Sequence, residues 1–291
     1  MSVIREFDPW KSPLCTCPPK YSLSPYTGCG HSCIYCYASS YIRNFYKVRS
    51  KKNLLTRIKK DLRKIDRNKV ISIANSSDPY TPPEAELKLT REVLKILVPA
   101  GCKILLVTKS DLVLRDLDII KRGKVSVSIT ITTLDKRLAK ILEPGAPPPD
   151  HRIKAVRVLS KEGIGVSVRV DPIIPLINDN FKEIEKLVEE VSKAGAKHLI
   201  TSTYKAKPDS LVRIIRAFPD HAQKFKELYL NEGERISGYR YLKNEKRLSI
   251  IKEVRNIALA HGLTFASCRE GFGYLNTAIC DGSHLIDYCL R

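Results

Sequence analysis

Short apolar runs alternate with longer amphipathic stretches along the first two thirds of the chain. In the longer stretches apolar residues recur at spacings of three and four, which is typical of helices with one buried face. The short runs have the length and the β-branched content of buried strands. We predict strands at 20–26, 70–75, 103–108, 125–133, 164–170 and 198–202. Strands that alternate with helices pair in parallel through right-handed crossovers, so the pattern predicts a parallel α/β core.

Helical spacing separates these strands and continues beyond them. We predict helices at 53–66, 83–98, 111–121, 135–142, 152–161, 181–194 and 244–260, and an aromatic-rich helical segment at 37–46. The chain then divides into an amino-terminal segment with cysteines (1–19), the strand–helix core (20–205), and a basic helical extension with a cysteine-bearing tail (206–291). Polar residues follow nearly every core strand. They should therefore meet at the carboxyl face of the sheet, where barrel enzymes have their active sites.

The composition is that of a globular protein, with 43% hydrophobic and 28% charged residues in a chain of 291. No apolar segment reaches the length of a membrane span, and the amino terminus lacks the apolar region of a signal peptide. We therefore expect a cytoplasmic protein with no membrane partner. Gln and Met each occur once beside abundant Lys, Arg and Glu, a bias typical of thermophilic proteins.

Positive charge exceeds negative charge by 20, and the excess is uneven. Residues 42–69 hold 12 Lys or Arg against two Asp, which is half of the total excess. A surplus of this size indicates a polyanionic partner such as DNA or RNA, the alternative being a solvated helix face. The candidate contacts lie on the outer face of the helix at 53–66: Arg57, Lys59, Lys60, Arg63 and Lys64.

Three cysteines lie close together in one loop. Cys29, Cys33 and Cys36 are spaced C-x3-C-x2-C, and thiolates at such short separations can face one soft metal centre. A closed structural site takes four ligands, and within this loop His31 is the candidate for the fourth. The spacing therefore predicts either a [4Fe–4S] cluster with one iron open to a small molecule, or a zinc knuckle that includes His31.

The loop also resembles a known signature. Its spacing, with an aromatic residue before the last cysteine, is similar to the loop of radical S-adenosylmethionine (SAM) enzymes. The string PYTGCGHSCIYCYA at 25–38 resembles the spore photoproduct lyase-like branch, often labelled "DNA repair photolyase". Over about 20–205 the resemblance implies a partial (β/α)6 barrel and a [4Fe–4S] cluster held by Cys29, Cys33 and Cys36. It further implies that SAM binds the open iron and is cleaved to a 5′-deoxyadenosyl radical, with an electron from a donor such as ferredoxin or flavodoxin.

The same resemblance implies a set of SAM contacts. They are Tyr35 and Tyr37 against the adenine and the cluster, Ser77 and Asp78 at the methionyl end, Lys109 at the carboxylate, and Thr130 at the ribose or carboxylate. Packing for Tyr37 and a turn for Asp78 are the simpler alternatives. One position departs from the lyase, which carries a hydrogen-donating cysteine where this chain has Ser76. The label "photolyase" therefore does not describe the expected activity.

These features leave three functions open. The first is a radical SAM enzyme that modifies or repairs a nucleic acid, which combines the cysteine loop with the basic helix. The second is a radical SAM enzyme with a small-molecule or peptide substrate. The third is a protein without enzymatic activity that binds nucleic acid and is stabilised by a metal.

Four further cysteines lie near the two ends of the chain, outside the core. Cys15 and Cys17 with Cys268 and Cys280 would form a four-thiolate set suited to a second iron–sulfur cluster or to zinc. The alternatives are a disulfide that ties the termini of a thermophilic protein together, or unligated buried thiols.

Overall fold

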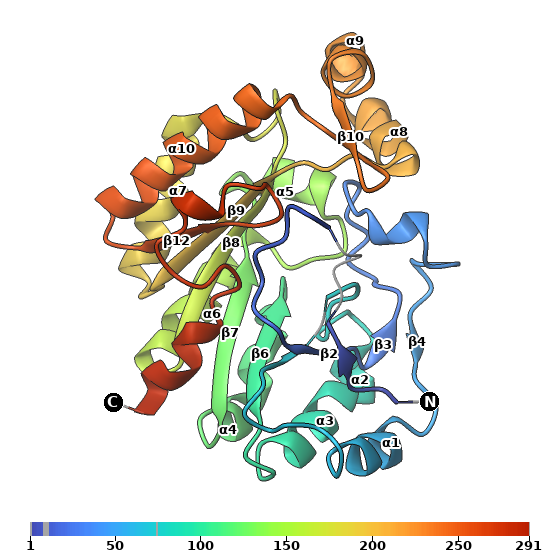
Figure 1. Ribbon diagram of the computed structural model, residues 1–291, viewed down its shortest axis with the longest axis vertical. Coiled ribbons are helices and arrows are strands. Elements are labelled where there is room, and N and C mark those ends of the chain that lie inside the picture. Colours follow the sequence, from blue (N-terminus) through green and yellow to red (C-terminus); the bar gives the residue numbers. More distant parts are fainter. Residues whose placement is uncertain (1, 8–11, 74, 291) are drawn as a thin grey trace.

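An eight-stranded sheet forms the centre of the computed structural model, which describes residues 2–7, 12–73 and 75–290, the last three as backbone alone. The strand order is β1-β2-β5-β6-β7-β8-β9-β12 (Figure 1). The β1–β2 pair is antiparallel, and the pairs from β2 through β12 are parallel. The strands are β1 (Arg5–Glu6), β2 (Tyr21–Leu23), β5 (Ile71–Ile73), β6 (Lys103–Thr108), β7 (Lys124–Thr130), β8 (Gly165–Ile173), β9 (His198–Thr203) and β12 (Thr264–Ser267).

The six predicted strands are confirmed as β2 and β5 to β9, in consecutive positions of the sheet. An open parallel sheet of this order, with helices between its strands, is the predicted partial (β/α)6 barrel. Residues 1, 8–11, 74 and 291, which fall within the predicted segments, lie outside the described residues. Two short antiparallel pairs flank the sheet: β3 (Tyr26–Thr27) with β4 (Arg49–Ser50), and β10 (Glu234–Ile236) with β11 (Tyr239–Tyr241).

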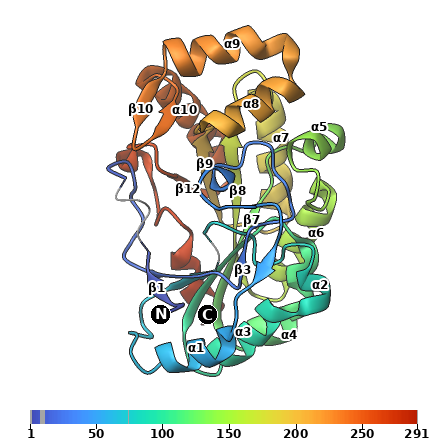
Figure 2. The same ribbon diagram turned by 90° about the vertical axis from the view of Figure 1, so that its right-hand side faces the viewer.

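Helices cover one face of the sheet, and the two chain ends cross the other (Figure 2). The α-helices are α1 (Leu54–Asp61), α2 (Glu84–Leu87), α3 (Leu89–Leu97), α4 (Leu117–Ile120), α5 (Lys136–Leu142), α6 (Pro149–Lys161), α7 (Phe181–Lys193), α8 (Pro208–Ala217), α9 (Ala222–Lys226) and α10 (Asn244–Ala260). Shorter 3-10 and π turns are η1 (Ala38–Ser40), η2 (Asp111–Asp116), η3 (Pro219–His221), η4 (Glu227–Asn231), η5 (Gly273–Leu275) and η6 (Ser283–Leu290).

Three predicted helices differ from those observed, and in the one expected at 111–121 the first six residues form the 3-10 helix η2. The helix expected at 83–98 is divided into α2 and α3, because Lys88 has a left-handed backbone with φ 51° and the Glu84 carboxylate accepts the amide of Thr90 after the break. The helical segment expected at 37–46 is a single 3-10 turn, η1, followed by turns. The turn η1 lies beside the cavity described below.

The two faces of β7 differ in residue type. Val125, Val127 and Ile129 belong to the main apolar core with the helices, whereas Ser126 and Ser128 alternate with them. These small side chains leave room for the carboxyl-terminal tail, where η6 packs against β6, β7 and β8. A Cβ built on Gly165 at the start of β8 would lie 2.4 Å from the Leu285 carbonyl oxygen. The tail thus fills the inner face near the start of the strands and leaves the carboxyl ends open.

The carboxyl-terminal extension is helical as predicted in α8, α9 and α10, but it also holds three strands that the sequence did not predict: β10 and β11 within the expected helical stretch, and β12. β12 pairs in parallel with β9, so this part of the extension continues the central sheet. The helices α8 and α9 form a second apolar core that includes Cys33 and Tyr35 of the cysteine loop.

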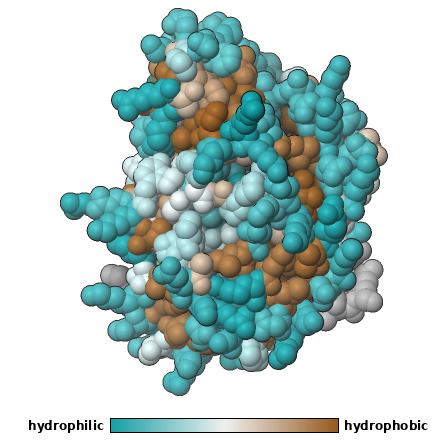
Figure 3. All heavy atoms as spheres, turned by 180° about the vertical axis from the view of Figure 1, so that it is seen from behind, coloured by the Kyte–Doolittle hydropathy of each residue, from teal (hydrophilic) through white to brown (hydrophobic). Residues whose placement is uncertain are grey.

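On the face turned away from the viewer in Figure 1, hydrophilic side chains surround patches of apolar residues (Figure 3). Among the described residues, the search for a helix long and apolar enough to cross a membrane finds none.

Candidate active site

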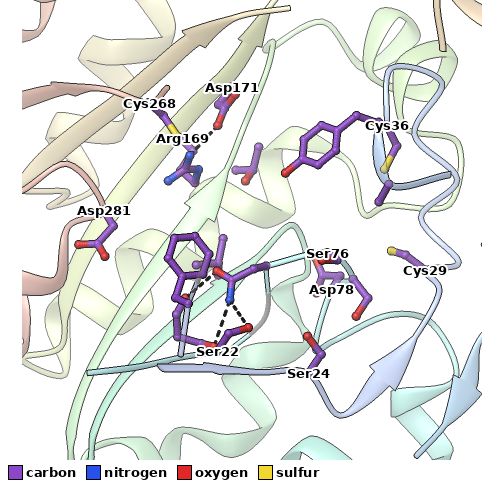
Figure 4. A pocket seen from close by; sticks show the side chains of 18 of the residues that line it. Ser22, Ser24, Cys29, Cys36, Ser76, Asp78, Arg169, Asp171, Cys268 and Asp281 are labelled. Carbon is purple, nitrogen blue, oxygen red and sulfur yellow. Dashed lines mark hydrogen bonds and ion pairs between the residues drawn. The ribbon is translucent and has the colours of Figure 1, made fainter. Parts of the chain in front are cut away.

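A cavity of about 810 Å³ opens at the carboxyl ends of the sheet strands, with the cysteine loop on one side (Figure 4). The predicted gathering of polar strand-end residues at this face is confirmed. The cavity is lined by Ser76, Ser77 and Asp78 after β5, Lys109 after β6, Thr130 on β7, Arg169 and Asp171 on β8, and Ser202 and Thr203 on β9. A cavity of this size holds a ligand of the size of SAM.

The cysteine loop is fixed by backbone contacts. The amide of Cys29 donates to the carbonyl of Phe45 at 2.9 Å, and a Cβ on Gly28 (φ +86°) would lie 2.3 Å from that same oxygen. Glycine is therefore required beside the first cysteine. All three cysteines line the cavity, and the sulfur atoms of Cys29 and Cys36 point from the loop toward the same part of it (Figure 4).

His31 is held by the surrounding protein. Its Nδ1 lies 3.1 Å from the carbonyl oxygen of Gly145, and its Nε2 lies 3.2 Å from Oδ2 of Asp78. The imidazole thus lies between Gly145 and the Asp78 carboxylate. In the part of the chain that the structure describes, no three His, Cys, Asp or Glu side chains are arranged around a single ion. Three cysteines that line one cavity are the donor set that a [4Fe–4S] cluster takes while keeping one iron open.

Lys109 places its ammonium on the cavity wall. Its Nζ lies 5.7 Å from the centre of the Tyr35 ring, and among the described side chains no carboxylate lies within ion-pair distance of it. Burial alone would lower the pKa of Lys109, but Cys33 and Glu143 outweigh it and hold the pKa above its ordinary value. The ammonium is thus charged and available to an anionic ligand, as the predicted contact with the SAM carboxylate requires. Thr130, also buried, lines the same wall.

Asp78 and Ser77 line the cavity but have internal partners. Asp78 accepts hydrogen bonds from the Thr108 hydroxyl at 2.6 Å and from the amide of Lys109 at 2.7 Å. Burial favours the neutral acid, but His31 and these donors lower the pKa of Asp78 to about 2. Ser77 donates to the carbonyl of Tyr26 at 3.0 Å. Both residues therefore hold strand ends and loops together, and their contact with SAM stays a prediction.

Tyr35 anchors the cysteine loop to the core. Its hydroxyl donates to the carboxylate of Glu143, which pairs with the fully buried Arg152 at 2.5 Å. Arg152 also donates to the carbonyl of Thr130 at 3.0 Å. This chain of contacts ties the loop to the segment after α5, to α6 and to β7.

Tyr37 belongs to an aromatic group at the rim of the cavity. Its ring stacks on Tyr41 with centroids 6.5 Å apart and meets Tyr239 edge-on at 5.7 Å. The guanidinium of Arg269 lies 4.7 Å from the Tyr239 ring and 5.7 Å from the Tyr37 ring. Sequence reasoning missed Tyr239 and Arg269, because contacts across some 200 residues leave no local signal. The alternation of basic and aromatic residues at 235–241 was the available hint.

The terminal cysteines also reach the cavity. Cys15, Cys17, Cys268 and Cys280 all line it, together with Lys20 and Asp281, which form a buried ion pair at 2.6 Å. The pKa of Cys17 is lowered because the thiols of Cys15 and Cys280 donate to it and because Lys20 lies nearby. The structure thus brings together the four cysteines that the sequence had grouped.

The basic residues of the predicted nucleic-acid surface divide into two groups. Arg57 on α1 lines the cavity, whereas Lys59, Lys60, Arg63 and Lys64 are exposed on α1 and the turn after it. The acid of this helix, Asp61, is buried, because it accepts hydrogen bonds from the amides of Val3 and Ile4. It therefore holds the amino terminus and leaves the outer face of α1 basic.

Comparison with known proteins agrees with this geometry. The family model described as the radical SAM superfamily matches residues 23–191, more than half of the chain. An uncharacterized protein of Mycobacterium tuberculosis is 26% identical over 259 residues, which cover 82% of this chain and 75% of that protein. A protein of Pseudomonas phage M6 named radical SAM Nalpha-GlyT isomerase is 23% identical over 256 residues, covering 84% of this chain and 53% of that protein.

A solved structure shares the fold. It is a mutant of spore photoproduct lyase with bound AdoMet and dinucleoside spore photoproduct, and it matches with a TM-score of 0.67 at 19% identity. The match covers 88% of this chain and 79% of that chain.

Proposed function

The chain belongs to the radical SAM superfamily, and from this premise we propose that it is a radical SAM enzyme whose substrate is a nucleic acid, which it modifies or repairs. When bound, a [4Fe–4S] cluster and SAM supply a 5′-deoxyadenosyl radical that abstracts a hydrogen atom from the substrate. The residues present fit these groups, because three thiols converge on the cavity and an unpaired ammonium lies on its wall.

The chain's own residues position the two groups. Cys29, Cys33 and Cys36 would ligate the cluster, and Lys109 would pair with the carboxylate of SAM. Tyr35 holds the loop in place through Glu143, and Thr130 presents its hydroxyl to the ribose or the carboxylate. The apolar core formed with α8 keeps water away from Cys33.

The positive charge of the cavity lining is the observation that supports a nucleic acid as the substrate. Eight cationic side chains line the cavity against four acidic ones, a formal excess of 8 − 4 = +4. The cations are Arg5, Lys20, Lys51, Arg57, Lys109, Arg169, Lys205 and Arg269, and the acids are Glu6, Asp78, Asp171 and Asp281. Phosphate groups of a polynucleotide are the natural counter-ions of such a surface.

Aromatic side chains complement this charge. Tyr37 and Tyr41 line the cavity, and Tyr41 is 44% exposed at its rim. Flat bases stack on exposed aromatic rings, with or without a neighbouring arginine, in many proteins that bind single strands. The bound dinucleoside in the spore photoproduct lyase structure supports the same substrate class. A small molecule or a peptide is the alternative, and it has no equivalent support from the lining.

The test is formation of 5′-deoxyadenosine by the anaerobically reconstituted protein with SAM and a chemical reductant. We expect the product to form with the full chain, and to be absent from a variant with Cys29→Ala, Cys33→Ala and Cys36→Ala. Separate pools of DNA, RNA and peptides are then added. If only DNA or RNA increases the formation of 5′-deoxyadenosine, the result supports the proposal. If only peptides increase it, the proposed nucleic-acid substrate is wrong. A colourless protein that forms no 5′-deoxyadenosine would favour the non-enzymatic alternative.

A further inference from the structure

A second group of cysteines lies across the cavity from the cysteine loop. Cys15 and Cys17 precede β2, Cys268 follows β12, and Cys280 precedes η6. Figure 4 shows Cys268, Arg169 and Asp281 on the side of the cavity that faces Cys29 and Cys36. Three segments that are distant in sequence therefore place sulfur atoms on one wall.

The thiols contact one another. Sγ of Cys17 lies 3.4 Å from Sγ of Cys280, and the Cys15 thiol lies beside Cys17. Cys268 lies beside Arg169 and interacts electrostatically with Cys17. All four are free thiols, and 3.4 Å is far beyond the S–S bond length of about 2.0 Å in a disulfide.

Cations flank this group. Nζ of Lys20, a residue that is only 3% exposed, lies 3.5 Å from Sγ of Cys17, and the guanidinium of Arg169 contacts Cys268. Both cations also pair with carboxylates, Lys20 with Asp281 and Arg169 with Asp171, each at 2.6 Å. Metal-bound thiolates would place further negative charge beside them. Donors beside the sulfur atoms are also the contacts that stabilise and tune iron–sulfur clusters.

Four thiolates suit an iron–sulfur cluster or a single zinc ion, and the donors beside the sulfur atoms favour the cluster. A zinc site would need its four sulfur atoms close around one centre, at about 2.3 Å from the metal. An iron–sulfur cluster is wider and can be held by four cysteines from separate segments.

We propose that Cys15, Cys17, Cys268 and Cys280 ligate a second iron–sulfur cluster, distinct from the one held by Cys29, Cys33 and Cys36. Binding displaces the protons of the four thiols. Two of the ligands lie in the amino-terminal segment, one follows β12 and one lies in the tail. The cluster would therefore cross-link these three segments at the cavity wall. This site does not depend on the identity of the substrate, so it can fail without affecting the proposed function.

The experiment measures iron, acid-labile sulfide and zinc in the full chain after anaerobic reconstitution. The first variant carries Cys29→Ala, Cys33→Ala and Cys36→Ala, and we expect it to keep stoichiometric iron and sulfide and an electron paramagnetic resonance signal after reduction. Adding Cys17→Ala or Cys268→Ala to this variant should abolish the bound iron and sulfide and the resonance signal. Adding Cys102→Ala is the matched control and should change neither, because Cys102 is buried after α3, away from the cavity.

Three results would overturn the second cluster. They are a folded triple variant free of iron and sulfide, a triple variant that holds zinc without sulfide, and a loss of two titratable thiols that marks a disulfide. If the triple variant does not fold, Cys17→Ala in the otherwise unchanged chain decides. We then expect the Cys17→Ala protein to lose the iron of the second cluster and still to form 5′-deoxyadenosine from SAM. An iron content equal to that of the unchanged chain would contradict the second cluster.

Discussion

Single residues at the strand ends differ in whether the fold itself uses them. Asp78 and Lys109 follow adjacent strands, yet Asp78 is surrounded by donors whereas the Lys109 ammonium faces the cavity. Sequence reasoning could place both at the cavity, because parallel strands end at one face. It could not distinguish their roles, because the partners of Asp78 come from other strands and loops.

Lys109→Met tests the unpaired ammonium. The change keeps the length of the side chain and removes its charge, so SAM should bind about 10- to 100-fold more weakly, in line with ~1.5–3 kcal/mol for a hydrogen bond to a charged group. Equilibrium dialysis with the reconstituted protein measures the affinity, and iron content should be unchanged. Lys154→Met, on the exposed side of α6, is the control. Equal affinity of both variants would remove Lys109 from the SAM site.

His198 predicts a pH dependence of stability. It is buried on β9 against the ring of His284. Burial, and to a lesser extent the charge of the neighbouring His284, lowers the pKa of His198 from 6.5 to about 3. At a pH between these two pKa values, His198 is protonated in the unfolded chain and neutral in the folded chain. The free energy of unfolding therefore falls as the pH falls. The loss between pH 6.5 and 4 should be about 3 kcal/mol.

Denaturant titrations over that pH range measure the effect. His198→Asn should flatten the dependence by about one proton, because Asn keeps a polar partner for Thr264 and does not titrate. His221→Asn, outside the sheet and only partly buried, should leave the slope unchanged. An unaltered slope in His198→Asn would show that another group is responsible.

At the scale of elements, the sequence was most informative where a period was sustained. The six core strands and α10 lie where the apolar pattern places them. The pattern failed at η1 and at Lys88, because these breaks are imposed by contacts with the cysteine loop and with Glu84. β12 was missed because its four residues are too short to show a period and because it pairs only through tertiary structure.

Helix α1 and the turn after it carry a prediction about nucleic-acid binding. Lys59, Lys60, Arg63 and Lys64 are exposed, and the carboxylate of Asp61 is turned inward to the amino terminus. Lys59→Glu, Lys60→Glu and Lys64→Glu together should weaken binding and reduce the dependence of log affinity on log salt by about 2–3 units. Fluorescence anisotropy over a salt series measures both.

A matched variant separates this surface from net charge. Lys154→Glu, Arg157→Glu and Lys161→Glu change the same charge on the exposed side of α6, and they should leave the slope nearly unaltered. If the two triple variants behave alike, α1 is a solvated face and the cations of the cavity alone contact the substrate.

At the scale of the whole molecule, the chain's two ends complete the site. The amino-terminal segment and the tail lie over the inner face of the sheet, and both contribute side chains to the cavity, as do Cys268 and Arg269 directly after β12. Cysteine counting could group the terminal cysteines, but it could not show that they face the motif loop. That arrangement depends on how the tail packs against β6, β7 and β8, which no local pattern records.

The tail itself should therefore belong to the cooperative core. Ile286 on η6 is 1% exposed, whereas Ile279, seven residues earlier in the same tail, is 43% exposed. Ile286→Ala should lower the free energy of unfolding by about 2–5 kcal/mol, the cost of a cavity in a packed core. Ile279→Ala removes the same atoms from the surface and should cost less than about 1 kcal/mol. Urea titrations of both variants make the comparison. Equal, small effects would mean that the tail folds apart from the sheet, and the cavity wall that carries Cys280 would then have no fixed position.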